Sequence, residues 1–236
     1  MKFYNYTIKE KKETTHNVFA LKLAPQDGGQ VFDYKPGQYV MIGIKNENGE
    51  VDEKRAFSLA SSPTNKDYIE LGFKIYGPFT QKTASLKEGD GIAVSEPTGT
   101  FTFSENRSTG SMMLAGGIGV TPLMSMIRYA CDKKLPNKIT LLYSNKTEND
   151  IVYYNEFKKL SEENSNFRVI FTITDDISAD WQGERGRIDK EMIKKYAGSL
   201  SSDHFLLCGP PGFMEATINN LKELGVSEMQ IEMEKF

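Results

Sequence analysis

The segment "SMMLAGGIGVTP", residues 111–122, determines the fold class of the C-terminal half of this chain. A compact apolar run leads into a turn with glycines at positions 116, 117 and 119, and Pro122 has the fixed φ that suits the first turn of a helix. This order is typical of a doubly wound sheet, which binds ligands at the carboxyl ends of its strands. The free N–H groups of such a turn favour an anion such as a pyrophosphate, although a glycine-rich turn also serves simple chain reversal.

Further apolar runs follow this segment at the spacing of a parallel sheet. They are "KITLLYS" (138–144), "FRVIFTIT" (167–174), "DHFLLCG" (203–209) and the terminal "SEMQIEMEKF" (227–236). Apolar stripes with helical spacing lie between them: Leu123, Ile127 and Cys131; Tyr154, Phe157 and Leu160; Met214, Ile218 and Leu221. Gly225 is placed to end the last helix. The pattern predicts a five-stranded parallel, doubly wound α/β domain over residues 107–236.

The N-terminal half has a different periodicity. Short, roughly alternating apolar segments such as "NVFALKL" (17–23), "QYVMIGI" (38–44) and "GIAVSE" (91–96) are separated by turn sequences rich in Gly, Asn and Asp. This pattern predicts an antiparallel β domain over residues 1–106, closed into a barrel.

Composition excludes several classes of function. A net charge of −3 gives no overall attraction to nucleic acid or to an anionic membrane. The two cysteines, Cys131 and Cys208, form no CxxC pair, so we expect no disulfide framework, no metal site and no protein-bound iron–sulfur cluster. The N-terminal "MKFYNYTIKEKKETTH" lacks the apolar core of a signal peptide, and no apolar run approaches the 18 residues of a membrane span. We therefore expect a cytoplasmic protein.

Seven motifs, in order along nearly the whole chain, resemble those of the ferredoxin–NADP reductase family. They are "PGQYV" (36–40), "RAFSLASSP" (55–63), "YGPFTQKTASLKEGD" (76–90), "GGIGVTP" (116–122), "YSNKTENDIVYYNEF" (143–157), "CGPPGFM" (208–214) and "EKF" (234–236). The resemblance implies a six-stranded antiparallel flavin barrel followed by a nicotinamide-nucleotide domain. It also implies hydride transfer between NAD(P)H and atom N5 of the flavin.

The resemblance places the flavin contacts in two of these motifs. Arg55 would pair with the flavin pyrophosphate, Phe57 would lie against the ring system, and Ser58 would direct its hydroxyl at N5. Phe57 stands where the family commonly has Tyr, so stacking is retained and one hydrogen bond is lost. Thr80 would contact the pyrophosphate, which favours FAD without excluding FMN. The remaining flavin contacts implied are Ala56, Phe73, Ile75, Gly77 and Phe79.

In the second domain the resemblance places Gly117, Gly119, Thr121 and Gly209 against the dinucleotide. Cys208 would lie near the reacting nicotinamide carbon, and Glu234 would orient the nicotinamide or relay a proton, so the implied catalytic set is Ser58, Cys208 and Glu234. Phe236 would cover one face of the flavin. Each has a structural alternative: Cys208 as a small buried hydrophobe, Glu234 as a surface charge, and Phe236 as the anchor of a strand.

Two residues give opposite indications about the nucleotide. Asp175 stands where NADPH-preferring relatives place an Arg, and a carboxylate accepts from a ribose 2′-hydroxyl but repels a 2′-phosphate. Lys146 could instead carry a cation toward a 2′-phosphate. The balance favours NADH and leaves NADPH open.

The electron acceptor is not identified by the sequence. Two cysteines cannot ligate a cluster with four thiolates, so we expect a separate acceptor: a ferredoxin, a flavodoxin, a subunit of a larger redox complex, free flavin or oxygen. The alternative function is a non-catalytic nucleotide-binding or regulatory subunit on the same scaffold.

Overall fold

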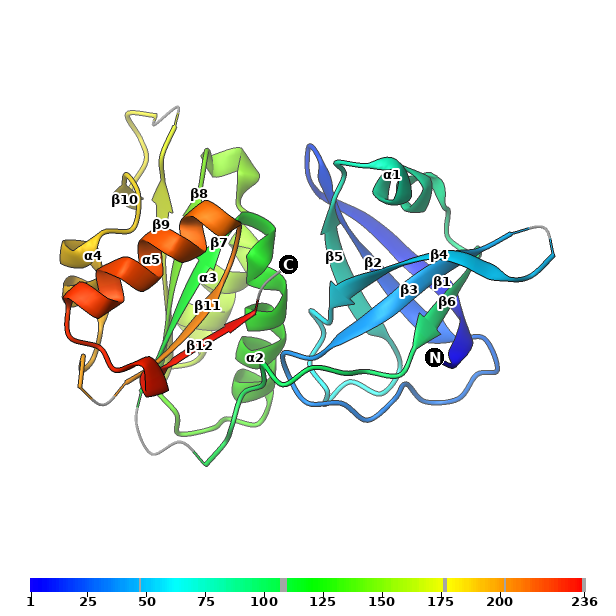
Figure 1. Ribbon diagram of the computed structural model, residues 1–236, viewed down its shortest axis with the longest axis horizontal. Coiled ribbons are helices and arrows are strands. Elements are labelled where there is room, and N and C mark those ends of the chain that lie inside the picture. Colours follow the sequence, from blue (N-terminus) through cyan, green and yellow to red (C-terminus); the bar gives the residue numbers. More distant parts are fainter. Residues whose placement is uncertain (47, 107–109, 176–177, 202, 235–236) are drawn as a thin grey trace. The chain divides into compact units, whose positions relative to one another are not determined.

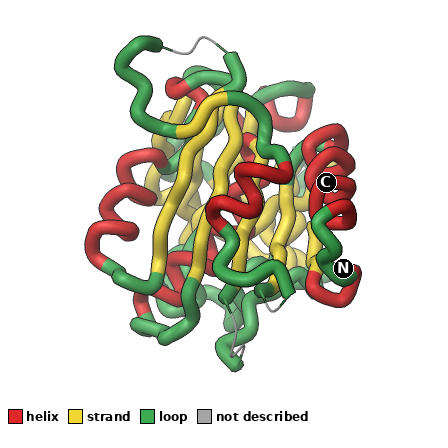
Figure 2. The backbone as a smooth tube through the Cα atoms, turned by 90° about the vertical axis from the view of Figure 1, so that its left-hand side faces the viewer, coloured by secondary structure: helices red, strands yellow, loops and turns green. Residues whose placement is uncertain are grey.

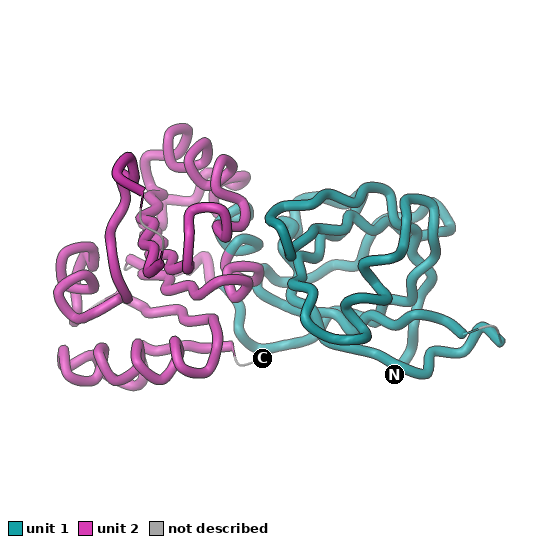
Figure 3. Tube along the Cα trace, turned by 90° about the horizontal axis from the view of Figure 1, so that it is seen from above, with its two compact units in different colours: residues 1–103, 124–129 teal, residues 104–123, 130–236 magenta. Residues whose placement is uncertain are grey.

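The computed structural model describes residues 1–236 except 47, 107–109, 176–177, 202 and 235–236. The chain divides into two compact units (Figure 3): unit 1 comprises residues 1–103 and 124–129, and unit 2 comprises residues 104–123 and 130–236. Helix α2 (Val120–Asp132) therefore contributes its middle turns to unit 1 and its two ends to unit 2.

Unit 1 is built on a six-stranded antiparallel sheet (Figure 1). Its strands are β1 (Phe3–Thr15), β2 (Val18–Pro25), β3 (Tyr39–Lys45), β4 (Val51–Ser58), β5 (Ile69–Lys74) and β6 (Gly91–Ser95), in the order β4-β3-β6-β1-β2-β5. The expectation of a closed barrel was wrong in one respect. The strand β4 ends at Ser58, and the residues after it reach β5 through an isolated bridge between Leu59 and Leu71 and a hydrogen bond from the Ala60 N–H to the Glu70 carbonyl. The sheet is barrel-like but carries no continuous ladder across this seam.

The longest strand, β1, was not predicted by the apolar pattern. Tyr6 and Ile8 alternate on its buried face, but the five residues after Ile8 are all Lys or Glu. The strand pairs with β2 on one side and β6 on the other, and its side chains join Leu21, Ile42 and Phe73 in the core of unit 1.

Unit 2 is a six-stranded parallel sheet flanked by helices (Figures 1 and 2). Its strands are β7 (Ser111–Gly116), β8 (Ile139–Asn145), β9 (Phe167–Ile173), β10 (Glu184–Arg185), β11 (His204–Cys208) and β12 (Ile231–Glu234), in the order β10-β9-β8-β7-β11-β12. The five predicted strands are confirmed. The sixth, β10, has two residues and leaves no apolar run in the sequence.

The helices lie on both faces of the sheet of unit 2, and Figure 1 shows α5 (Pro211–Glu223) in front of it and α3 (Tyr154–Glu163) behind it. Alternation along the strands separates the two layers. Leu142 of β8 belongs to the cluster packed with α5 and with α4 (Lys190–Tyr196), whereas the ring of Tyr143 contacts Phe157 of α3 at 6.0 Å between centroids. Gly225, with a φ of 79°, follows α5 as predicted.

Candidate functional site

The predicted flavin residues of β4 lie at the end of that strand. Arg55 is exposed and forms an ion pair of 2.9 Å from Nη2 to Glu53 Oε1, with 57% of its side chain accessible. Its guanidinium lies 5.7 Å from the centre of the Phe79 ring. An ion pair this exposed is weak, so the Arg55 donors can be transferred to a phosphate at little cost.

Three aromatic rings meet beside Arg55. Phe57 packs against Phe73 at 5.2 Å and is nearly parallel to Phe79 at 6.2 Å. Phe73 and Phe79 are buried, whereas Phe57 is only partly covered. Phe57 therefore has ring surface available to a planar ligand, and a separate contact of Phe73 with the flavin stays a prediction.

Ser58 ends β4 and has an unusual environment. Its side chain is buried, with 3% exposed, and its Oγ has no hydrogen-bond partner among the described residues. A buried hydroxyl without a partner costs roughly 1–3 kcal/mol of stability. A hydroxyl can both donate and accept a hydrogen bond, and the predicted contact of this one with the flavin stays a prediction.

The "GPFTQ" segment begins helix α1 (Pro78–Ser85). The backbone N–H groups of Tyr76 and Gly77 both donate to Thr80 Oγ1 at 3.1 Å, and the Thr80 hydroxyl donates to the Gly77 carbonyl at 3.0 Å. The Thr80 hydroxyl therefore shapes the turn. The first N–H groups of a helix lack intrahelical partners and are the donors that this turn presents to an anion.

Tyr76, directly before this turn, was not selected from the sequence. It is 84% exposed, so its ring is accessible from solvent. The signal in the sequence is an aromatic residue immediately before "GPFT". Ile75, which precedes it, is partly buried against the core of unit 1.

In unit 2, two predicted glycine turns pack against each other. A Cβ atom on Gly119 would lie 2.6 Å from the backbone carbonyl of Cys208, and one on Gly209 would lie 3.1 Å from the backbone N of Gly116. Gly117 adopts a φ of 53°, and no atom lies within 4 Å of the position of its Cβ. The carboxyl ends of β7 and β11 thus form a backbone surface that a dinucleotide can approach closely.

Thr121 follows this turn at the start of α2. Its side chain is buried, and Oγ1 donates to the carbonyl of Ile118 at 2.8 Å, which closes the short helix η1 (Gly117–Gly119). A direct contact of Thr121 with the nucleotide stays a prediction.

Cys208 and Glu234 are register partners on the parallel strands β11 and β12. Cys208 is fully buried, and desolvation together with the Glu234 carboxylate raises the pKa of its thiol, so it stays protonated. Burial also raises the pKa of Glu234 above its ordinary value. The pair therefore offers a neutral thiol beside a carboxyl group that holds its proton to higher pH than an exposed one. The predicted Phe236 lies outside the described residues.

The two residues that gave opposite indications about the nucleotide are adjacent in the structure. The backbone N–H of Asp175 donates to the Lys146 carbonyl at 2.7 Å, and that of Thr174 donates to the Asn145 carbonyl at 3.1 Å. Both the Asp175 and the Lys146 side chains are exposed. The chain after β9 is therefore held against the chain after β8, and both charges lie at the carboxyl edge of the sheet.

Two family models match the chain, one for each half. Residues 5–103 match the oxidoreductase FAD-binding domain, and residues 113–219 match the oxidoreductase NAD-binding domain. NADH-cytochrome b5 reductase 1 from Aspergillus terreus is 29% identical over 235 residues, covering 96% of this chain and 79% of that protein. The reductase component of propane 2-monooxygenase from Mycolicibacterium smegmatis is 27% identical, covering 97% of this chain and 66% of that protein.

Among solved structures, the FAD/NAD-binding domain of nitric oxide dioxygenase from Vibrio cholerae has the same fold. It superposes with a TM-score of 0.87 at 24% identity, covering 99% of this chain and 98% of that domain. Fold, domains and relatives together define an FAD- and NAD-dependent flavoprotein reductase. The chain carries both of these oxidoreductase domains, and it shares its fold with a ferredoxin NADP⁺ reductase from Neisseria gonorrhoeae, at a TM-score of 0.83 and 22% identity over 99% of this chain and 98% of that one.

The described residues contain no helix with the length and apolar character of a membrane span. They also hold no group of three or more His, Cys, Asp or Glu side chains placed to bind a metal ion.

Proposed function

We propose that this protein is an NADH-dependent, FAD-containing reductase that passes electrons to a separate acceptor protein. The observation that carries the proposal is the buried, unpartnered Ser58 hydroxyl beside the exposed Arg55 and the partly covered ring of Phe57. When bound, FAD supplies a group that takes a hydride from reduced nicotinamide and releases electrons one at a time.

Each flavin-side residue has a distinct task in this proposal. Arg55 exchanges its ion pair with Glu53 for the pyrophosphate, which it can contact with two parallel donors. The N–H groups at the start of α1 contact the same phosphates, and Tyr76 offers an exposed ring for the adenine. Phe57 contacts the flavin ring, and Ser58 hydrogen-bonds to N5 in both of its protonation states. Ala56, Phe73, Ile75, Gly77, Phe79 and Thr80 complete this set.

In unit 2, Gly117 has open space for the dinucleotide to approach its backbone, and Gly119 and Gly209 let the two turns pack closely enough to form that surface. Thr121 supports the turn of Gly117. Cys208, a buried neutral thiol, would lie near the nicotinamide, and Glu234 would hold or move a proton beside it. The raised pKa of Glu234 suits that task because it brings the carboxyl group nearer to its working pH. Phe236 remains part of the proposal on sequence resemblance alone.

Asp175 supports NADH as the electron donor. Its exposed carboxylate at the carboxyl edge of the sheet can accept a hydrogen bond from a ribose 2′-hydroxyl and repels a 2′-phosphate. The name of the Aspergillus terreus relative, an NADH-cytochrome b5 reductase, supports the same choice.

The relatives also favour a redox protein as the acceptor. One is named for cytochrome b5 and another is the reductase component of a monooxygenase. We place the acceptor in the class of small haem, iron–sulfur or flavin electron carriers, ferredoxins and flavodoxins included, or in a larger redox complex, and we place the reaction in the cytoplasm.

An anaerobic absorbance experiment tests this function. The purified protein is saturated with FAD, and stoichiometric NADH and NADPH are added to separate samples. Bleaching of the band at roughly 450 nm by NADH, and more slowly by NADPH, is the expected result. A protein that neither takes up FAD nor oxidises either nucleotide would contradict the proposal and favour a non-catalytic nucleotide-binding or regulatory subunit.

A further inference from the structure

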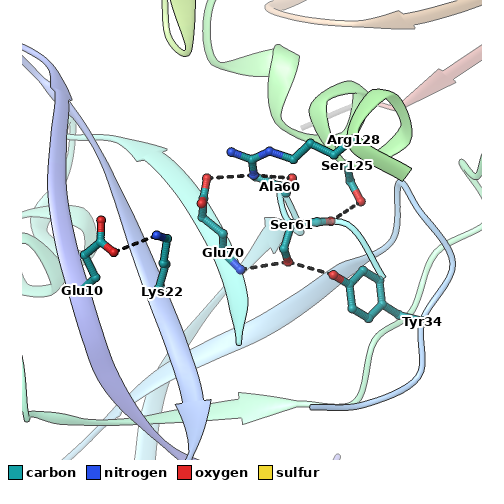
Figure 4. Close-up of polar contacts among 8 residues, drawn as sticks. All are labelled: Glu10, Lys22, Tyr34, Ala60, Ser61, Glu70, Ser125 and Arg128. Carbon is teal, nitrogen blue, oxygen red and sulfur yellow. Dashed lines mark hydrogen bonds and ion pairs between the residues drawn. The ribbon is translucent and has the colours of Figure 1, made fainter. Parts of the chain in front are cut away.

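The three residues after Ser58 are each held by hydrogen bonds, and Figure 4 shows those of Ala60 and Ser61. The backbone N–H of Leu59 donates to the Gln38 carbonyl at 2.9 Å, and that of Ala60 donates to the Glu70 carbonyl at 2.8 Å. The backbone N–H of Glu70 donates to Ser61 Oγ at 2.9 Å, and the same hydroxyl shares a hydrogen bond of 2.8 Å with the hydroxyl of Tyr34.

Helix α2 supplies the remaining partners of this segment. Arg128 Nη1 donates to the Ala60 carbonyl at 2.8 Å, and Ser125 Oγ donates to the Ser61 carbonyl at 2.6 Å (Figure 4). Both side chains come from residues 124–129, the part of α2 that belongs to unit 1. The backbone two and three residues after Ser58 is thus fixed by side chains that lie more than sixty positions further along the chain.

Arg128 is itself held by a buried charge. Nη1 lies 3.1 Å from Glu70 Oε1, and only 15% of the Arg128 side chain and 7% of the Glu70 side chain are exposed. Burying two charges is costly, and such pairs contribute little net stability compared with an apolar pair of similar volume. The pair instead fixes the orientation of the Arg128 guanidinium, because this planar group is held by the Glu70 carboxylate and the Ala60 carbonyl together.

Ser58 differs from the three residues that follow it in its hydrogen bonding. The N–H groups of Leu59 and Ala60, the carbonyls of Ala60 and Ser61 and the Ser61 hydroxyl are all paired. The Ser58 hydroxyl, at the start of the same segment, has no partner among the described residues. A hydroxyl that must meet one ligand atom needs a rigid backbone beneath it. We propose that Arg128, together with Ser125, is a positioning residue that fixes the backbone after Ser58 and thereby aims the Ser58 hydroxyl at the flavin.

This inference rests on the proposed function, in which Ser58 contacts the flavin. It adds a role for Arg128 and Ser125, which belong to neither the flavin motif nor the glycine turn. Lysine cannot reproduce the guanidinium, since its ammonium is a point donor on a flexible stem. Arg128→Lys is therefore expected to have a rate of flavin reduction between those of Arg128→Met and the wild type.

A double-mutant cycle tests the coupling. Stopped-flow reduction of the bound flavin by NADH is measured for the wild type, Arg128→Met, Ser58→Ala and the double variant, with the FAD dissociation constant measured for each. Arg128→Met is expected to slow reduction on the order of tenfold in the wild type but by less than about twofold in the Ser58→Ala background. Its FAD dissociation constant should stay within about twofold of the wild-type value. A full tenfold slowing in both backgrounds, or no slowing in either, overturns the proposal.

Hydrogen exchange of the flavin-free protein gives a second readout that does not depend on activity. The amide of Ala60 is expected to exchange on the order of tenfold faster in Arg128→Met than in the wild type, because its segment loses an anchor. Unchanged exchange at residues 59–61 also overturns the proposal. The cycle and the exchange measurement are repeated with Ser125→Ala, which supplies the test if Arg128→Met does not fold.

The matched control is Glu223→Gln. It breaks the ion pair from Lys190 Nζ to Glu223 Oε2, 2.5 Å long and 39% and 61% exposed, which joins two helices of unit 2. It should leave both readouts unchanged, and equal effects from both variants would mark the Arg128 result as general loosening and overturn the proposal. Failure of the wild type to bind FAD or oxidise NADH refutes the proposed function, whereas wild-type activity with an uncoupled cycle refutes only the role of Arg128.

Discussion

The hydroxyl of Tyr143 donates a hydrogen bond of 2.9 Å to the carbonyl of Gly117. Tyr143 is fully buried, and desolvation raises the pKa of its phenol well above the ordinary value, so the hydroxyl remains a neutral donor. Gly117 holds the left-handed φ of 53° in the turn after β7. A core side chain of the sheet therefore fixes the backbone of the turn that we propose as a contact of the dinucleotide.

Removing this hydroxyl tests the importance of that contact. Tyr143→Phe is expected to weaken binding of NAD⁺ roughly fivefold, because the Gly117 carbonyl loses a hydrogen bond worth about 1 kcal/mol. Isothermal titration with the FAD-loaded protein measures the change. Tyr154→Phe on helix α3 is the control and should bind normally, and equal affinities for all three proteins would show that the turn holds its shape without Tyr143.

Ser58→Ala is expected to move stability and rate in opposite directions. The substitution removes a buried hydroxyl without a partner, so the flavin-free protein should gain roughly 1 kcal/mol in its free energy of unfolding. Reduction of bound flavin by NADH should slow roughly tenfold or more, with FAD retained. Urea unfolding and stopped-flow absorbance give the two values. A variant that is less stable and reduced at the wild-type rate would remove Ser58 from the mechanism.

Arg55→Ala should act on flavin affinity. Hydrogen bonds to a charged group contribute roughly 1.5–3 kcal/mol, so the FAD dissociation constant is expected to rise roughly 10- to 100-fold. Fluorescence titration of the flavin-free protein measures it. Glu53→Gln is the matched control because it frees Arg55 from its ion pair, and it should bind FAD at least as tightly as the wild type. An unchanged affinity in Arg55→Ala would place the pyrophosphate elsewhere.

Asp175→Arg should change the nucleotide preference. Replacing a carboxylate that repels a 2′-phosphate by a guanidinium that pairs with it is expected to raise the ratio of kcat/KM for NADPH to that for NADH by about tenfold or more. Steady-state kinetics with both nucleotides checks the ratio. Lys146→Ala should move it slightly in the opposite direction, and a ratio unaffected by either change would locate the 2′ site away from this edge.

The close approach of β7 and β11 makes a prediction about stability. An alanine at position 119 would place its Cβ 2.6 Å from backbone atoms of Cys208, so Gly119→Ala should lower the free energy of unfolding by roughly 1–3 kcal/mol. Gly212→Ala in helix α5 has open space around the new Cβ and should be neutral or raise stability by up to about 1 kcal/mol. Chemical denaturation distinguishes the two, and equal stabilities would show that the glycine turns are free to separate.

The sequence predicted the parallel sheet well because strands buried on both faces leave uninterrupted apolar runs, as in residues 111–115 and 204–208. It missed β1, where Tyr6 and Ile8 are separated by polar residues and the other face carries charge. Helix α4 was missed because it is seven residues long and buries Met192 and Ile193 with little further periodicity.

The sequence points to candidate site residues where they stand in one motif, and it gives no signal where distant residues combine. Arg55, Phe57 and Ser58 are consecutive or nearly so, and the structure places all three at one end of β4. The bonds from Arg128 to Ala60 and Glu70 join positions 68 and 58 residues apart, and no local pattern signals them. Thr80 was predicted for its hydroxyl, but the structure shows that hydroxyl bonded within its own turn.

The discontinuous composition of unit 1 has a consequence for protein synthesis. Glu70 is made 58 residues before Arg128, and a chain elongating at about 5–20 residues per second exposes that carboxylate for several seconds before its partner is translated. The part of unit 1 that has already been made can collapse before Arg128 is translated. The segment after Ser58 receives its last anchors only when Ser125 and Arg128 have left the ribosome. If flavin binding depends on those anchors, it follows the synthesis of helix α2.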